Sequence, residues 1–106
     1  MTQLQSYIAG RWIGSQPAQA LRSAIDGAVV AHTHDDAIDF GEALHYARTT
    51  GLAAMRKTDF QQRAGMLKAL AKYLGERKEE MYALSFQTGA TRTDGWVDIE
   101  GGTGTL

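Results

Sequence analysis

The spacing of apolar residues changes once along this chain, and that change does most to limit its fold. Up to about residue 34, short apolar and aromatic runs alternate with turn residues, which is typical of β-hairpins. Beyond it, apolar residues recur at every third or fourth position, which is typical of amphipathic helices. The sequence therefore predicts an α+β fold, with a β-hairpin ribbon over 1–34 and three to four α-helices over 35–106.

Two turn signals divide the N-terminal part. Ala9-Gly10 lies inside LQSYIAGRWIG, and Asp26-Gly27 lies inside LRSAIDGAVVAHT. Glycine adopts positive φ at little cost, and an Asp-Gly pair favours a type I′ turn. These residues predict two small hairpins or a ribbon of three to four strands, with Pro17 in the loop between them.

Capping signals mark where the helices begin. Asp39 with Glu42 predicts a helix from about 39 to 56, and Thr58 with Gln61 predicts the start of the next one. The apolar stripe of that second helix consists of Phe60, Ala64, Leu67, Leu70, Ala71 and Leu74.

Glycines and a charged run interrupt or end these helices. Gly51 weakens the first helix by about 1 kcal/mol relative to Ala, so we expect frayed or kinked geometry there. After Gly75 the charged run ERKEE (76–80) interrupts the stripe, and either one kinked helix or two helices in line fits the pattern. We interpret the run as a solvated face with local i,i+3 and i,i+4 pairs. Gly89 predicts a helix stop.

His32 and His34 are the first candidate for chemistry. On an extended chain they share a face, and with Asp35 and Asp36 they form a possible zinc site. No further ligand is evident elsewhere, and acidic residues are favoured before a helix start by the helix dipole alone. We favour the structural interpretation over a metal-binding module.

Asp94, Asp98 and Glu100 form the second candidate. General acid/base chemistry needs carboxylates that converge on a pocket. The same spacing fits the solvated face of a helix from about residue 93, and we favour that interpretation. The buried side of this helix is then expected to carry Trp96, Val97 and Ile99.

The segment GGTGTL (101–106) has the glycine content of a phosphate-binding loop. A dinucleotide fingerprint needs G-x-G-x-x-G between a strand and a helix, whereas this segment supplies only G-G-x-G. We therefore interpret its glycines as sites of close packing between helices.

Composition excludes several functions. The chain has no cysteine, so these residues contain no disulfide, thiolate metal site or cysteine nucleophile. Its net charge of −1 provides no basic field for nucleic acid. The start MTQLQSYIAGRW lacks the features of a secretory signal, and no apolar run is long enough to span a bilayer. We expect a cytoplasmic location.

The order of motifs resembles the N-terminal part of the aldehyde dehydrogenase superfamily, within its Rossmann-like coenzyme domain. The resemblance rests on IAGRW, HYARTTGLAAMRK and FQQRAGMLKALAKYLGERKEEMYALSFQTG. The last stretch, ALSFQTGATRTDGWVDIEGGTGTL, is similar to bifunctional members that join the dehydrogenase to a MaoC-like enoyl-CoA hydratase in aerobic phenylacetate breakdown.

This resemblance implies a parent enzyme that opens the ring of oxepin-CoA and oxidises the resulting semialdehyde with NADP or NAD. The family works through a cysteine thiolate, and no motif for its nucleophile, base, oxyanion hole or cofactor loop is present here. We therefore assign no catalytic, cofactor-binding or metal residue. Arg63, Thr88 and Gly89 match the family pattern, and we interpret them as a helix-surface anchor and a helix stop.

The leading hypothesis is that residues 1–106 are an N-terminal fragment of such an enzyme, without activity of its own. Its expected partners are the remainder of the dehydrogenase domain and further copies of the chain, through the helices at 39–56 and 58–88. No nucleic acid, membrane or bound cofactor is expected for the fragment. The alternative is a complete small helical interaction module without enzymatic activity.

Overall fold

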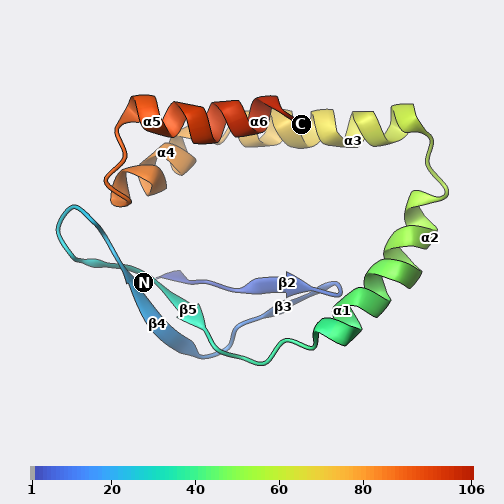
Figure 1. Cartoon of the computed structure of the whole chain (residues 1–106), viewed down its shortest axis with the longest axis horizontal. Coiled ribbons are helices and arrows are strands. Elements are labelled where there is room, and N and C mark those ends of the chain that lie inside the picture. Colours follow the sequence, from blue (N-terminus) through green and yellow to red (C-terminus); the bar gives the residue numbers. More distant parts are fainter. Residues whose placement is uncertain (1) are drawn as a thin grey trace. The chain divides into compact units, whose positions relative to one another are not determined.

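The computed structural model describes residues 2–106, and Met1 of the predicted ribbon lies outside them (Figure 1). The chain divides into two compact units. Unit 1 contains the residues up to Arg22 together with Ala28–Thr58, and unit 2 contains Ser23–Gly27 and Asp59–Leu106. Strands and helices in this order confirm the predicted α+β class.

Unit 1 contains two small sheets. Its strands are β1 (Thr2–Gln3), β2 (Ser6–Ile8), β3 (Arg11–Ile13), β4 (Pro17–Arg22) and β5 (Val29–His34). Strands β2 and β3 form an antiparallel hairpin, and the other sheet has the order β1-β5-β4. In that sheet β4 runs antiparallel to β5, whereas β1 runs parallel to it. The parallel pairing was not predicted, because β1 is only 2 residues long and carries no periodic pattern.

The β2–β3 turn confirms the first turn prediction. Ala9 has φ 50° and Gly10 has φ 79°, as a type I′ turn requires at both central positions. The strands are in register, with Tyr7 opposite Trp12 and a ring-centroid distance of 5.0 Å.

The second turn differs from its prediction. Gly27 has a positive φ of 74°, but Asp26 does not, so no type I′ turn forms there. The N–H of Gly27 donates to the carbonyl of Ser23 at 3.0 Å, and the Ser23 hydroxyl accepts from the N–H of Ile25 at 3.1 Å. Ser23 thus closes the connection between β4 and β5, which is longer than a two-residue turn. Pro17 is the first residue of β4 rather than part of a loop, a place where a strand tolerates its missing N–H.

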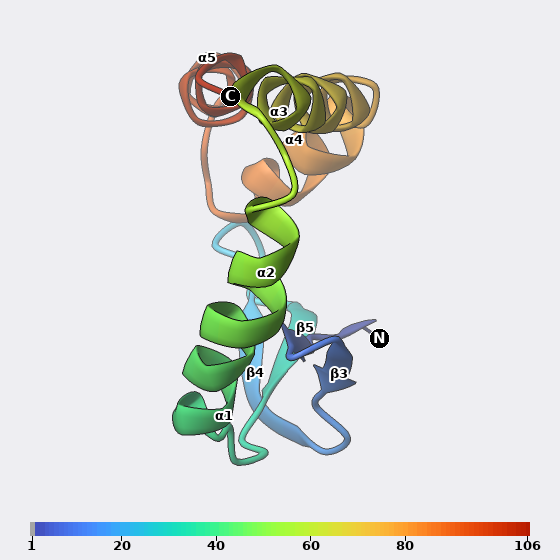
Figure 2. The same cartoon turned by 90° about the vertical axis from the view of Figure 1, so that its right-hand side faces the viewer.

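The helix predicted over 39–56 is present as one continuous helical segment (Figure 2). It comprises α1 (Phe40–Tyr46), the π-helix η1 (Ala47–Gly51) and α2 (Leu52–Met55). The π-helix ends at Gly51, which matches the irregularity expected there. Asp39 caps the helix by accepting from the N–H of Glu42 at 2.9 Å.

The reciprocal half of that capping box is absent, which corrects the prediction. The carboxylate of Glu42 instead accepts two hydrogen bonds from the guanidinium of Arg11, at 2.7 and 2.8 Å. A bidentate Arg–carboxylate pair is a stronger partner than one backbone N–H. This pair ties the hairpin to α1 within unit 1.

The regular elements of unit 2 are all helices. They are α3 (Phe60–Gly75), α4 (Lys78–Gln87), α5 (Arg92–Trp96), the π-helix η2 (Val97–Gly101) and α6 (Gly102–Gly104). Of the two arrangements left open around ERKEE, the structure has two helices, separated at Glu76-Arg77. Gly89, with φ 85°, confirms the predicted helix stop after α4.

The cap of α3 lies one residue beyond its predicted position. Asp59, not Thr58, accepts from the N–H of Gln62 at 2.7 Å, and the Gln62 side chain accepts from the N–H of Asp59 at 2.9 Å. Thr58 with Gln61 and Asp59 with Gln62 both have the spacing of a capping box. With Asp59 as the cap, Phe60 is the first residue of the helix.

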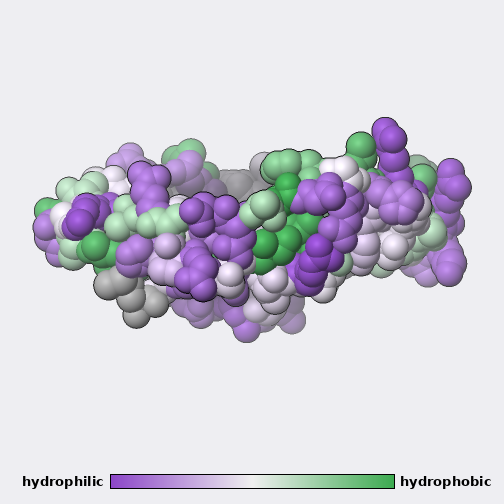
Figure 3. Space-filling view, turned by 90° about the horizontal axis from the view of Figure 1, so that it is seen from below, coloured by the Kyte–Doolittle hydropathy of each residue, from purple (hydrophilic) through white to green (hydrophobic). Residues whose placement is uncertain are grey.

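Very little apolar surface is buried in the described part of the chain. The buried apolar residues there are Ala31 and Tyr82, with Ser23 as a buried polar one. The stripe of α3 has its predicted helical spacing, yet it is exposed, with Phe60 at 85% and Leu67 at 46%. Figure 3 accordingly shows hydrophobic residues at the surface, next to hydrophilic ones.

The accessible area quantifies this exposure. The chain exposes 8000 Å². Two separate compact units of half its mass each would expose about 7,000 Å² in total, by the usual scaling of surface with mass. The excess is therefore at least about 1,000 Å². Residues 2–106 contain no helix with both the length and the apolar character that crossing a membrane requires.

We predict that Asp59→Ala lowers the free energy of unfolding by about 1 kcal/mol, because the first turn of α3 loses its side-chain acceptor. Urea unfolding followed by far-UV circular dichroism measures this change. Asp59→Asn retains an acceptor and is the matched control, expected within a few tenths of a kcal/mol of the wild type. Equal losses in both variants would contradict the capping role.

Candidate functional site

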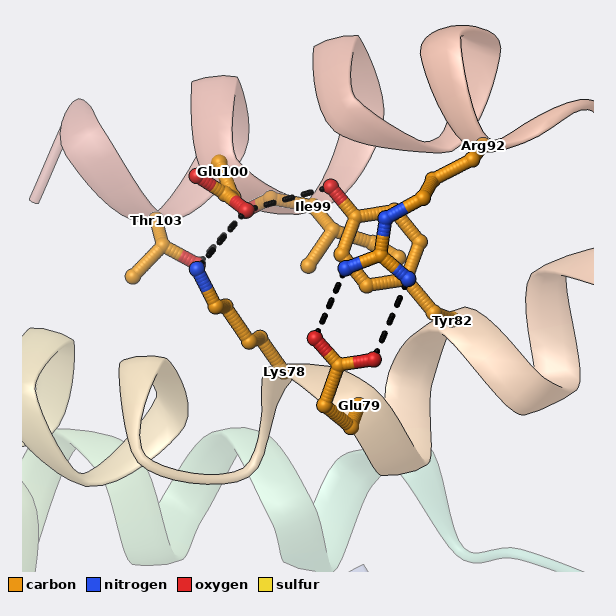
Figure 4. A network of polar contacts seen from close by, with 7 residues as sticks. All are labelled: Lys78, Glu79, Tyr82, Arg92, Ile99, Glu100 and Thr103. Atoms are coloured by element: carbon orange, nitrogen blue, oxygen red, sulfur yellow. Dashed lines mark hydrogen bonds and ion pairs between the residues drawn. The ribbon is translucent and has the colours of Figure 1, made fainter.

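The polar cluster around Tyr82 joins three helical segments of unit 2 (Figure 4). Tyr82 in α4 is 2% exposed, and it is the buried residue of that helix. Its ring lies against Gly95 in α5, where an added Cβ would come within 3.2 Å of two ring carbons. The guanidinium of Arg92 lies 4.2 Å from the ring centroid, a cation–π distance.

Glu100 in η2 is the acceptor at the centre of this cluster. Its Oε1 accepts from Lys78 Nζ at 3.1 Å and from the Tyr82 hydroxyl at 3.1 Å. The hydrogen bond from Lys78 lowers the pKa of Glu100, with burial opposing it and the Tyr82 and Trp96 side chains adding to it. The pKa of Tyr82 is raised, first by burial and then by its hydrogen bond to the Glu100 carboxylate.

A second ion pair closes the other side of the cluster. Arg92 donates two hydrogen bonds to the Glu79 carboxylate, at 2.8 and 3.1 Å (Figure 4). The hydrogen bond from Arg92 lowers the pKa of Glu79, and the same bond raises the pKa of Arg92. Arg92 therefore holds α5 against α4 through both its ring contact and its ion pair.

Two shallow hollows flank the cluster and share Glu100. One, of about 320 Å³, is lined by Ala71, Gly75, Lys78, Ile99, Glu100 and Thr103. The other, of about 290 Å³, is lined by Tyr82, Arg92, Thr93, Trp96 and Glu100.

The chemistry available to the cluster follows from its pKa directions. The pKa values of Glu79 and Glu100 are lowered by their cationic partners, and burial raises the pKa of Tyr82. Each shift moves the group further from neutrality, whereas a general acid or base needs a pKa near the working pH. These pKa directions favour a role of the cluster in holding α4, α5 and η2 together.

The three candidate carboxylates lie in different settings. The Asp94 side chain caps α5 with Thr91, whose hydroxyl donates to it at 2.7 Å and lowers its pKa. Asp98 is exposed, as predicted. Glu100 contradicts the prediction of a solvated face, because it contacts Lys78 and Tyr82.

The apolar side of that helix also differs from the prediction. The helix itself is present, starting at Arg92, but Trp96 is 55% and Val97 is 62% exposed. The physical reason is that α5 packs on the Tyr82 ring through Gly95, so the next two residues around the helix, Trp96 and Val97, lie away from that contact. The spacing of apolar residues cannot anticipate a contact made by a glycine.

The ERKEE run does not make only local pairs. Lys78 and Glu79 bind Glu100 and Arg92, which are distant in sequence. One local pair exists at its edge, between Lys72 and Glu76 at 3.9 Å. The guanidinium of Arg77 lies 3.6 Å from the centroid of the Tyr73 ring.

The prediction that the glycines of GGTGTL allow close packing between helices is wrong. An added Cβ at Gly102 or Gly104 would meet nothing within 4 Å, and at Gly101 it would meet a carbonyl at 3.9 Å. The glycine that permits close helix packing is Gly95, which the sequence analysis did not single out. The available signal is its position between Asp94 and Trp96, inside the segment predicted to be helical.

The histidine cluster lies in and after β5. His34 Nε2 hydrogen-bonds the Ser6 hydroxyl at 2.9 Å, which links β5 to β2. The Asp36 carboxylate accepts from the N–H and the hydroxyl of Ser15, both at 2.9 Å, and the backbone bond is the main cause of its lowered pKa. Over residues 2–106, no group of three or more His, Asp or Glu side chains is placed to hold a metal ion.

The three residues that match the family pattern take structural positions. The guanidinium of Arg63 lies 5.3 Å from the Phe60 ring centroid on α3. The hydroxyl of Thr88 donates to the carbonyl of Ser85 at 2.7 Å, next to Gly89. Their positions fit the interpretation as a helix-surface residue and a helix stop.

Comparison with known proteins gives one informative similarity. No protein-family model matches the chain. Over 100 residues the chain is 34% identical to a 3,4-dehydroadipyl-CoA semialdehyde dehydrogenase from Aromatoleum evansii. The similar region covers 92% of this chain and 19% of that protein. The chain thus spans about a fifth of the relative, and the similarity supports a relation to the aldehyde dehydrogenases.

We predict that Gly95→Ala destabilises unit 2, because its Cβ would lie 3.1 Å from Ser85 Oγ and 3.2 Å from the buried Tyr82 ring. Overpacking of this kind typically costs about 1–3 kcal/mol. Gly102→Ala is the matched helical control with open space around it, and it should gain up to about 1 kcal/mol. Thermal unfolding compares the two, and equal stability would contradict the packing role of Gly95.

We also predict that the wild type loses stability in acid through Glu100. Its folded pKa is lowered, so its contribution is fully present above the unfolded value of about 4.3 and is lost as pH falls through the folded pKa. Urea unfolding at a series of pH values should show a smaller loss below about pH 4 in Glu100→Gln than in the wild type. Parallel pH profiles would count against this assignment.

Proposed function

We propose that this chain is the N-terminal part of a bifunctional enzyme of aerobic phenylacetate breakdown. Its dehydrogenase half oxidises a CoA-linked semialdehyde in the cytoplasm with NADP or NAD. A MaoC-like half supplies that semialdehyde by hydrolytic opening of oxepin-CoA. The observation that carries the proposal is the 34% identity over 100 residues to a CoA-semialdehyde dehydrogenase.

The role of residues 1–106 in that enzyme is structural. The sequence has no cysteine for the thiolate step of the family. The charged groups around Tyr82 are paired and have pKa values shifted away from neutrality, which supports a stabilising role. The remainder of the dehydrogenase domain covers apolar surface of α1 and α2, where Phe40 is 75% and Leu44 is 51% exposed.

The test uses the enzyme encoded by the complete reading frame. We expect it to reduce NADP or NAD when a CoA-linked semialdehyde is added, followed by the absorbance of the reduced nicotinamide. We expect residues 1–106 alone to give no signal. A second assay follows consumption of oxepin-CoA without nicotinamide, which tests the hydrolytic half separately.

Two controls sharpen this experiment. A free aldehyde of matched chain length tests whether CoA is recognised, and Asp59→Ala in the complete enzyme tests whether the fold of this part supports activity. No reduction of either nicotinamide would contradict the proposal. If the reading frame also stopped after Leu106, the alternative of a small interaction module would replace it.

A further inference from the structure

The connection between β4 and β5 belongs to a different unit from the two strands that it joins. Residues Ser23–Gly27 group with the helices of unit 2, whereas Arg22 before them and Ala28 after them group with unit 1. A two-residue turn is sufficient to join two antiparallel strands. The additional length of this connection is explained by the contacts that it makes within unit 2.

The connection is closed on itself around Ser23. The Ser23 residue is 5% exposed, and its hydroxyl accepts from the N–H of Ile25 at 3.1 Å. Its carbonyl accepts from the N–H of Gly27 at 3.0 Å, where the positive φ of 74° suits glycine. Buried polar groups are normally hydrogen-bonded, and these two are satisfied inside the connection. The connection therefore has a defined shape of its own.

The last turn of α4 is the partner of this connection. The final four carbonyls of a helix have no partner within that helix. At the end of α4, the carbonyl of Phe86 accepts from the N–H of Gly89 at 3.0 Å. The carbonyl of Gln87, the final residue of α4, accepts from the N–H of Ala24 at 2.8 Å. The last carbonyl of the helix is thus satisfied by a residue that is distant in sequence.

Ala24 also lies beside the glycine that ends the helix. A Cβ added at Gly89 would lie 3.7 Å from the Cβ of Ala24, which is an ordinary van der Waals distance. Gly89 has a positive φ of 85°, the conformation that commonly follows a helix end. The hydrogen bond and this contact together place Ala24 directly on the C-terminal end of α4.

We infer that Ser23–Gly27 is a strap that docks on the C-terminal end of α4 and holds its last turn in place. The same helix carries Lys78, Glu79 and Tyr82, so the strap also steadies the element on which the polar cluster is built. Release of the strap frees the last turn of α4 without breaking the β4–β5 pairing, because both strands belong to unit 1. This inference goes beyond the proposed function, since it depends only on contacts within the chain.

The test removes the strap from the whole chain and measures backbone hydrogen exchange by NMR. Residues 23–28 are replaced by Asn-Gly, which joins the paired residues Arg22 and Val29 through a type I′ turn. We expect the amides of Thr88 and Gly89 to exchange about twofold to tenfold faster, the effect of one lost hydrogen bond. The paired amides of β4 and β5 should exchange as in the wild type.

A point variant tests the same contact without changing the length of the connection. Ala24→Pro removes the N–H that donates to Gln87, and we expect the same faster exchange at Thr88 and Gly89. Ala24→Ser retains this N–H and is the matched control, expected to exchange as the wild type does. Far-UV circular dichroism shows whether each variant is folded, and Ala24→Pro decides the question if the shortened chain does not fold.

Three results would overturn the inference. The first is rapid exchange of the Ala24 amide in the wild type, because a docked strap protects that amide. The second is wild-type exchange of Thr88 and Gly89 in Ala24→Pro. The third is equal acceleration in Ala24→Pro and Ala24→Ser, which would show that the side chain and not the N–H matters.

Discussion

The buried ring of Tyr82 is the contact on which the helices of unit 2 depend. Gly95 allows α5 to approach the ring, Arg92 stacks on it, and its hydroxyl donates to Glu100 in η2. A Cβ at position 95 would come within 3.2 Å of the ring, and Glu100 in η2 reaches both Lys78 and the Tyr82 hydroxyl of α4. The same residues that position the helices therefore also position the charges, and the polar cluster is a consequence of one packed ring.

Unit 1 is held in a similar way, by specific contacts rather than by a large core. The bidentate pair of Arg11 and Glu42 joins the hairpin to α1, and the backbone at Gly10 lies close to the Tyr46 hydroxyl. His34 bonds Ser6 and connects the two sheets. Few apolar side chains are buried in the described part of either unit, and burial of this kind is what normally stabilises a domain. Exposed ion pairs contribute too little free energy to replace it. Contacts with other protein surfaces are the natural source of the missing burial.

The elements that could be predicted are those set by neighbouring residues. The Ala9-Gly10 turn, the helical segments and the stop at Gly89 follow from local conformational preferences, which one sequence displays directly. The β1–β5 pairing and the ion pairs of Lys78 and Glu79 depend on residues far apart in sequence. Glu100 was placed on the wrong face because η2 departs from the regular helical period. The packing role of Gly95 depends on Tyr82 and Ser85 in another helix, so no local pattern around this glycine predicts it.

These features describe a chain whose local structure is well specified and in which the helices of unit 2 depend on one packed ring. Backbone hydrogen exchange of the wild type and of Gly95→Ala tests this most directly, because it measures the protection of each helix separately. We expect Gly95→Ala to lower the protection of α4 and α5, while the protection of β4 and β5 stays constant. Equal protection of α4 and α5 in the two proteins would contradict the account.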